Sequence, residues 1–257
     1  MVATVVTSSS ALWYFARATG IVALILLTIS VILGILTTVR WSSRSWPRFA
    51  VEYLHRNVTL LLLAFILLHV ATIVIDGFAP IGWISVLVPL SSPYRPIWLG
   101  LGALGFDLLL AVALTSWLRH RVGFTVWRAL HWSAYAAWAL VVIHGLGAGT
   151  DTKQSWTLLI DAACVLGVMV AVWWRLAVGW EQQTRIRIAA LVATVVIPAA
   201  LVAFVLVGPL APNWARRSGT PATILARTGG STTISLQPKS GAPGRAKAAD
   251  PDRDNDG

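Results

Sequence analysis

The sequence predicts an all-α integral membrane protein, built as a six-span helical bundle with a disordered C-terminal tail. Of its 257 residues, 57% are hydrophobic and only 12% are charged, and mean hydropathy is +0.74. A chain of this length with that composition is typical of a membrane protein and not of a soluble core. We expect a six-helix transmembrane domain over residues 1–211 and a disordered extracytoplasmic tail over residues 212–257.

Six apolar runs recur along the chain, each with about 20 or more residues, which is enough to cross a hydrocarbon layer of about 30 Å. Trp and Tyr collect near several run ends, as expected for an interfacial belt. The first run is long enough to span, and no basic segment precedes it, so no cleavable signal peptide is expected. The predicted spans are Leu12–Val39, Phe49–Ile75, Ile97–Leu118, Val126–Gly147, Trp156–Val178 and Ile188–Val207.

Two segments outside these spans have their own character. Residues 77–96 are apolar but contain four prolines, so we expect a short amphipathic or re-entrant piece that covers the outer end of the bundle. After Pro209 the chain becomes rich in Gly, Pro, Ser and charge, which predicts disorder. Within this tail, Thr232–Leu236 is the piece that could add a strand to a partner.

Basic residues sort to one side of the predicted membrane. By the positive-inside rule, the first, third and fifth connections are cytoplasmic and both termini are extracytoplasmic, in a multi-pass protein of the plasma membrane. The net charge of +10 is then matched by lipid headgroups, and no nucleic acid partner is expected. The cytoplasmic set is Arg40, Arg44, Arg48, Arg56, Arg119, Arg121, Arg128, Arg175, Arg185 and Arg187; the opposite side offers Arg17, Arg95 and Lys153.

Four of the five histidines lie in two of the spans. His55 and His69 are 14 positions apart, a rise of roughly 21 Å, and they share one face of an ideal helix to within about 40°. His131 and His144 are 13 positions apart, a rise of roughly 20 Å, but an ideal helix would turn them about 140° apart. A local irregularity in the fourth span, or two differently placed cofactors, must absorb that difference.

The two spans run in the same direction, so His55 pairs in depth with His131 near the cytoplasmic edge, and His69 pairs with His144 near the outer edge. Polar side chains are costly in hydrocarbon, so four matched histidines favour cofactor ligation over tolerated polar residues. A pair of imidazoles can ligate a haem iron from both sides. His120, in a basic turn, is expected to be solvated.

Glycines beside the last of these histidines indicate where a cofactor would need room. Gly145 removes a side chain next to His144, where a porphyrin would approach closely. Gly147 and Gly149 would leave the outer end of this span open in the same way.

The sequence around the histidines, WRALHWSAY at His131 and IHGL at His144, resembles the ferric reductase-like transmembrane family. This is the haem-bearing membrane domain of ferric reductases, NADPH oxidases and the haem subunit of the bacterial methionine sulfoxide reductase system. The resemblance covers roughly Leu12 to Val178. Diheme quinol-oxidising cytochromes use similar distances on another helix arrangement.

The resemblance implies haem b, with two groups expected, His55 and His131 as inner ligands and His69 and His144 as outer ligands. It implies an oxidoreductase component that passes electrons from a cytoplasmic or quinol donor to an extracytoplasmic acceptor. The flavin and nicotinamide domain of ferric reductases is not expected here, so a separate flavin reductase or the quinol pool is the expected donor. The alternatives are a non-redox haem-binding subunit for haem storage, sensing or assembly, and a diheme quinol-oxidising cytochrome b subunit.

Other polar residues are candidates for supporting roles. Arg56 and Arg128 inside, and Arg17, Arg95 and Lys153 outside, could pair with haem propionates or with lipid headgroups. Two carboxylates lie in apolar spans, where each could be protonated, paired, or part of a proton or quinone route; they are Asp107 and Asp161. The single cysteine, Cys164, is expected to be a small buried side chain.

Overall fold

The computed structural model describes residues 2–39, 41, 46–77, 79–178 and 184–230, and it confirms the predicted fold class. Within these ranges the regular structure is all helical, and six helices are long and apolar enough to cross a membrane. These candidate spans are Ala11–Thr38, Arg48–Asp76, Pro96–Trp117, Phe124–Ala148, Ser155–Ala177 and Ile188–Val207. The helices are α1 (Val2–Thr38), α2 (Arg48–Asp76), α3 (Trp83–Leu87), α4 (Pro96–Trp117), α5 (Arg119–Val122), α6 (Phe124–His131), α7 (Ser133–Ala148), α8 (Ser155–Ala177), α9 (Thr184–Val207), α10 (Trp214–Arg217) and α11 (Ala222–Gly230).

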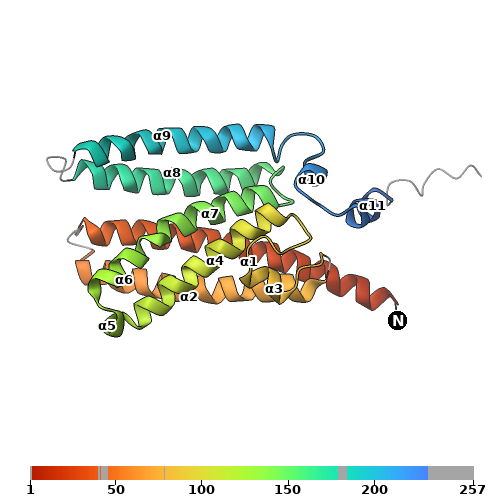
Figure 1. Ribbon diagram of the computed structural model, residues 1–257, viewed down its shortest axis with the longest axis horizontal. Helices are drawn as coiled ribbons and strands as arrows, with labels where there is room; N and C mark the ends of the chain where they lie inside the picture. Colours follow the sequence, from red (N-terminus) through yellow and green to blue (C-terminus); the bar gives the residue numbers. More distant parts are fainter. Residues whose placement is uncertain (1, 40, 42–45, 78, 179–183, 231–257) are drawn as a thin grey trace, which may run out of the picture.

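The long helices lie side by side along the long axis of the molecule, with α1 at the centre of the packing (Figure 1). Helix α1 contacts α2, α7 and α8, whereas α4 packs along α7 and α9 packs on α8. The interior contains aliphatic side chains from several of these helices, including the fully buried Ile35, Leu62 and Val142. The start of α1 and the short helices α3, α10 and α11 gather at one end of the bundle, and α5 lies at the other (Figure 1).

The outer surface of the bundle is apolar, as the bilayer requires. Leu60, Leu61, Leu67 and Leu68 on α2 are all exposed, so this helix presents a leucine face away from the protein. Helix α9 exposes valines and isoleucines in the same way. Lipid tails are as apolar as these side chains, so exposing them in a membrane costs nothing comparable to exposing them in water.

Helix boundaries follow the residues that break or start helices. Helix α2 begins after Pro47 and ends at Asp76. The next residue, Gly77, has a left-handed φ of 64° that a glycine adopts without strain. Pro96 occupies the first turn of α4, where its missing N–H costs no hydrogen bond. Gly123, with φ of 81°, separates α5 from α6.

The fourth predicted span is not one regular helix. It is divided at Trp132 into α6 and α7, immediately after His131. A local irregularity was one of the two ways in which the sequence could accommodate the 13-residue histidine spacing, and it lies between the two histidines. Arg175 of α8 stabilises this region, because it donates a hydrogen bond to the Tyr135 hydroxyl at 3.0 Å and lies over the Trp132 ring.

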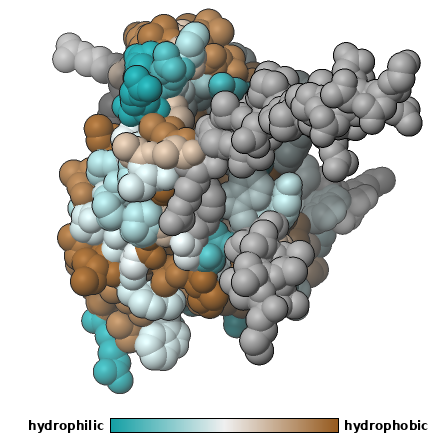
Figure 2. Space-filling model, turned by 90° about the vertical axis from the view of Figure 1, so that its right-hand side faces the viewer, coloured by the Kyte–Doolittle hydropathy of each residue, from teal (hydrophilic) through white to brown (hydrophobic). Residues whose placement is uncertain are grey.

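The proline-rich second connection forms the short helix α3, which packs against α4. Its large apolar side chains, Trp83, Ile84 and Leu87, are exposed. Figure 2 looks onto this end of the molecule, where apolar and polar residues are interspersed over the surface. A short helix with exposed apolar residues at the end of a transmembrane bundle is suited to the membrane interface.

The chain beyond residue 211 differs from the expected disorder as far as Gly230. It forms α10 and α11, and Trp214 packs against Trp98 and Phe204 while its indole N–H donates to the Gly147 carbonyl at 3.2 Å. The composition of the segment did not reveal this outcome, because the contact depends on individual side chains such as Trp214 and not on the average polarity of the segment. Residues 231–257, including Thr232–Leu236, lie outside the described residues.

Arg95 joins this C-terminal segment to the bundle. It is buried, its backbone N–H donates to the Gly219 carbonyl at 3.0 Å, and its side chain donates to Thr220. The same guanidinium donates to the carbonyls of Gly147 and Ala148 at the end of α7. These are the carbonyls that a helix C-terminus leaves unpaired, so a cation is favourable there.

Replacing Trp214 by Ala should destabilise the protein, because the indole is half-buried between aromatic rings. We expect a loss of about 2 to 3 kcal/mol, which lowers the melting temperature by about 5 to 10 °C. Thermal unfolding of the purified protein in detergent measures this. Trp117→Ala is the matched control: Trp117 is 79% exposed, and its replacement should cost less than about 1 kcal/mol. Equal melting temperatures for the two variants would contradict the packing role.

Candidate functional site

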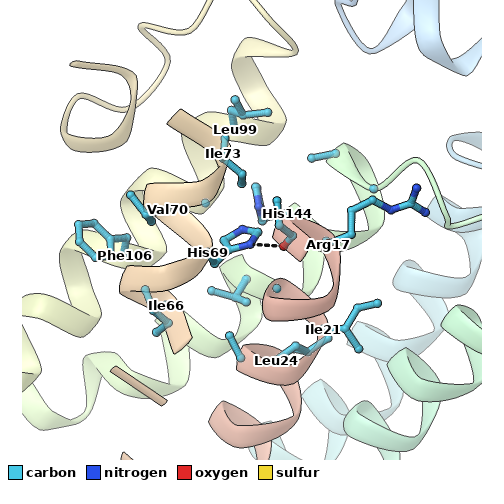
Figure 3. Close-up of a pocket in the computed structure, with 18 of the residues that line it drawn as sticks. Arg17, Ile21, Leu24, Ile66, His69, Val70, Ile73, Leu99, Phe106 and His144 are labelled. Carbon is cyan, nitrogen blue, oxygen red and sulfur yellow. Dashed lines mark hydrogen bonds between the residues drawn. The ribbon is translucent and has the colours of Figure 1, made fainter. Parts of the chain in front are cut away.

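A cavity of about 320 Å³ lies between the helices and is lined by His69 of α2 and His144 of α7. Figure 3 shows the two imidazoles close together, with apolar side chains such as Ile66, Val70 and Phe106 around them. We call His69 and His144 the outer pair and His55 and His131 the inner pair, following the orientation expected from the basic residues. The outer pair therefore shares one largely apolar cavity.

Both imidazoles of the outer pair are held by backbone carbonyls of neighbouring helices. His69 Nδ1 lies 2.8 Å from the Ala16 carbonyl oxygen of α1 (Figure 3), and His144 Nδ1 lies 2.8 Å from the Trp98 carbonyl oxygen of α4. A carbonyl oxygen can only accept, so Nδ1 carries the proton in each ring and donates it. The other nitrogen, Nε2, then has a free lone pair that can ligate a metal.

The inner pair is brought together at the other end of the same helices. The ring centroids of His55 and His131 are 6.4 Å apart, with the ring planes at 75°. Two imidazoles that ligate one metal from opposite sides, each through a bond of about 2.0–2.1 Å, have centroids about 6 Å apart. The separation of the inner rings thus matches the span of a bis-imidazole metal site.

The two inner histidines have different supports. His55 Nδ1 donates to the Ser30 carbonyl of α1 at 3.0 Å, as in the outer pair. His131 Nδ1 is buried and has no hydrogen-bond partner among the described residues. Its ring instead stacks on Trp127, one turn earlier in α6, at a centroid distance of 5.1 Å. Three of the four imidazoles are therefore oriented by hydrogen bonds and the fourth by stacking.

The described part of the chain contains no group of three or more His, Cys, Asp or Glu side chains that could hold a metal ion without help. What it offers is two pairs of imidazoles. A pair suits a metal that already has equatorial ligands, as the iron of a porphyrin has.

Of the basic residues predicted to support a cofactor, Arg17 lies in the outer cavity (Figure 3). It forms an ion pair with Asp151, and its guanidinium lies over the Trp13 ring. Arg95 is directed instead to α7 and the C-terminal segment, as described above, and Lys153 is exposed.

At the inner end, Arg56 and Arg128 are both exposed, and the Arg128 guanidinium lies 5.5 Å from the centre of the Phe124 ring. His120 is exposed on α5. Among the residues that the structure describes, neither arginine has a hydrogen bond or ion pair that holds its guanidinium near the inner pair.

The two intramembrane carboxylates are separated by the fold. Asp161 of α8 lines the outer cavity, whereas Asp107 of α4 does not. Cys164, one turn after Asp161, is buried as expected. Asp161 is thus the one of the two with access to the candidate site.

The sequence suggested that glycines near His144 make room for a cofactor, and the structure supports this for only some of them. Gly145 lines the cavity and has open space where a side chain would be. Gly147 does not open the end of α7: a Cβ there would meet the Trp98 ring, so this glycine serves helix packing. Sequence reasoning missed Gly20 and Gly34 of α1, which lie against His69 and His55; their 14-residue spacing, equal to that of the histidines, was the available signal.

Comparison with family models decides the affiliation of the chain. The model of the ferric reductase like transmembrane component matches residues 19–148, about half of the chain and the part that contains all four histidines. The chain belongs to the ferric reductase-like transmembrane family. Searches of curated proteins and of solved structures return no significant match. The resemblance stated from the sequence is therefore confirmed, and this member of the family is a multi-pass membrane protein.

Proposed function

We propose that this protein is a haem b-containing electron carrier of the plasma membrane that passes electrons from a cytoplasmic or quinol donor to an extracytoplasmic acceptor. The observation that carries the proposal is the presence of two facing histidine pairs, one toward each end of the bundle, separated by 14 positions along α2, or roughly 21 Å. A protein that held a redox group at only one end could not connect the two sides of the membrane in this way.

The residues at both ends fit a haem. The outer pair faces a largely apolar cavity and has Nε2 free on both rings, and the inner rings have a bis-imidazole separation. Ferric reductase-like domains generally bind haem, which supports the same assignment. We therefore propose that His69 and His144 would hold an outer haem, and that His55 and His131 would hold an inner haem.

Haem b, when bound, supplies reversible one-electron chemistry of its iron. The protein's part is to hold the imidazoles in one tautomer, to keep water out with aliphatic side chains, and to place cations near the membrane surfaces. Arg17 at the outer cavity, and Arg56 and Arg128 at the inner end, are the cations that we assign to the propionates. Asp161 is positioned to take part in proton or quinone chemistry at the outer cavity.

The donor is proposed to be a separate molecule, either a flavin reductase on the cytoplasmic side or the quinol pool. Flavin or quinone would then be contributed through that partner, and the chain would act as the membrane component of an oxidoreductase.

Single ligand replacements should remove haem by pair and not by helix. His55→Ala and His131→Ala should each lose the inner haem, and His69→Ala and His144→Ala the outer one, because each removes one of the two imidazoles that would hold that haem. The haem content, measured by pyridine haemochrome assay, should fall from about two per chain to about one. Reduction of the remaining haem by the donor should survive only where the outer haem is lost.

His120→Ala is the control for this series, because an exposed histidine on α5 is remote from both pairs, and it should keep both haems. Spectra in which His55→Ala matches His69→Ala would refute the pairing. A parent protein purified without haem from haem-replete cells would refute the proposed function itself.

Arg17→Gln should lower the midpoint potential of the outer haem, because loss of a nearby positive charge disfavours the reduced form and leaves Asp151 unpaired. We expect a shift on the order of 1 kcal/mol, or roughly 40 mV for one electron. A redox titration followed optically measures it. Lys153→Gln, which removes an exposed cation at the same end, should shift the potential less. An equal or larger shift in that control would remove Arg17 from the site.

The orientation can be tested with single cysteines in a Cys164→Ala background. Ser91 and Gln154 are exposed at the end that we place outside, and Arg121 is exposed at the opposite end. Ser91→Cys and Gln154→Cys should be labelled in whole cells by an impermeant thiol reagent, whereas Arg121→Cys should be labelled only after the cells are opened. The reverse pattern would invert the proposed direction of electron transfer.

A further inference from the structure

Three of the four site histidines are held by the same local arrangement. In each case the Nδ1–H donates to a helix carbonyl, and the residue four positions later in that helix is a glycine against which the imidazole lies. The three sets are Ala16 and Gly20 with His69, Ser30 and Gly34 with His55, and Trp98 and Gly102 with His144. A glycine at this position lets a ring reach a carbonyl that the next turn of the helix would otherwise shield.

The three glycines differ in how much space an added Cβ would have. A Cβ built on Gly20 would lie 2.8 Å from Cε1 of His69, and one on Gly102 would lie 2.5 Å from Nδ1 of His144. Both distances are well inside van der Waals contact, so the ring or the helix would have to move. A Cβ on Gly34 would lie 3.4 Å from Cε1 of His55, which is a tolerable contact. The requirement for glycine is therefore strict only at the outer pair.

We propose that Gly20 and Gly102 are positioning residues of the outer haem: they allow α1 and α4 to approach the outer histidines closely enough for the Ala16 and Trp98 carbonyls to fix the tautomer and plane of each ring. This inference rests on the proposed function and deepens it. Neither glycine contacts the iron; each acts through the imidazole that it borders.

The fourth histidine shows what replaces the arrangement when the glycine is absent. The residue 14 positions after Gly102 in α4 is Ser116, and its hydroxyl accepts a hydrogen bond from the Trp127 indole at 3.2 Å. Trp127 in turn stacks on His131. The inner site therefore has one ring set by a carbonyl and one set by stacking, whereas the outer site has two rings set by carbonyls.

The hydrogen bonds have a chemical consequence. An imidazole that donates from Nδ1 is a more basic ligand at Nε2, and loss of such an outer partner costs about 10- to 100-fold in metal affinity. A more basic ligand favours the ferric state. Weakening the bond should thus raise the midpoint potential of the outer haem as well as loosen it.

The test compares Gly20→Ala and Gly102→Ala with Gly34→Ala, in the full chain purified with its haem. The first two should raise the midpoint potential of the outer haem, change the electron paramagnetic resonance signal that reports the planes of its axial imidazoles, and increase its loss to apomyoglobin by at least about tenfold. The inner haem should be unaffected in both variants. Gly34→Ala should leave both haems with parental potentials and spectra.

A double variant separates positioning from general packing. In the His69→Ala background the added Cβ at Gly20 has no ring to meet, so Gly20→Ala/His69→Ala should match His69→Ala in inner haem content and thermal stability. A double variant less stable than His69→Ala would overturn the inference. The inference would also fail if Gly20→Ala and Gly102→Ala had the same outer-haem potentials and spectra as Gly34→Ala. Neither outcome refutes the proposed function, which a parent protein without haem would refute.

Discussion

A polar side chain inside a bilayer must find its hydrogen-bond partner within the protein, and this constraint organises the bundle around its histidines. Helical backbone carbonyls are already bonded within their helix, but each retains a second lone pair. His69, His144 and His55 use that lone pair on neighbouring helices. Each bond satisfies one ring nitrogen and leaves the other with a lone pair that could ligate a metal.

This solution explains why α1 is central although it contributes no histidine. It supplies carbonyls to both histidines of α2, and it also packs against α7 and α8. Close approach of helices in a membrane depends on small residues, since no hydrophobic effect drives apolar helices together in lipid. Gly20 and Gly34 lie against the two histidines of α2, but only at Gly20 would an added Cβ force the ring or the helix to move.

Different contacts stabilise the two ends of the bundle. At the outer end, Arg95 and Trp214 tie α4, α7 and the C-terminal segment together beside a cavity that contains Arg17 and Asp161. At the inner end, the α6–α7 irregularity is stabilised by Arg175, and the histidine rings lie at the separation that a shared metal requires. The two histidine pairs are thus alike in residue type and different in surroundings.

Composition and spacing by themselves determined the six-span all-α class and the matching depths of the two histidine pairs, and the residues around the histidines carried the family resemblance. These follow from local properties: the length of an apolar run, the rise of a helix, and the identity of neighbouring residues. The sequence also showed that the 13-residue spacing of His131 and His144 needed an adjustment, but not where it would occur.

Only the tertiary structure decided which hydrogen-bond acceptor each imidazole uses. Every residue has a backbone carbonyl, so the sequence does not mark the one that accepts the bond. The tertiary structure also decided that Gly147 meets Trp98 while Gly20 and Gly102 meet histidines, and that Trp214 packs a segment whose composition predicts disorder. These outcomes depend on contacts between residues tens of positions apart. Helical periodicity predicts which residues share a face, but the approach of a second helix determines what that face touches.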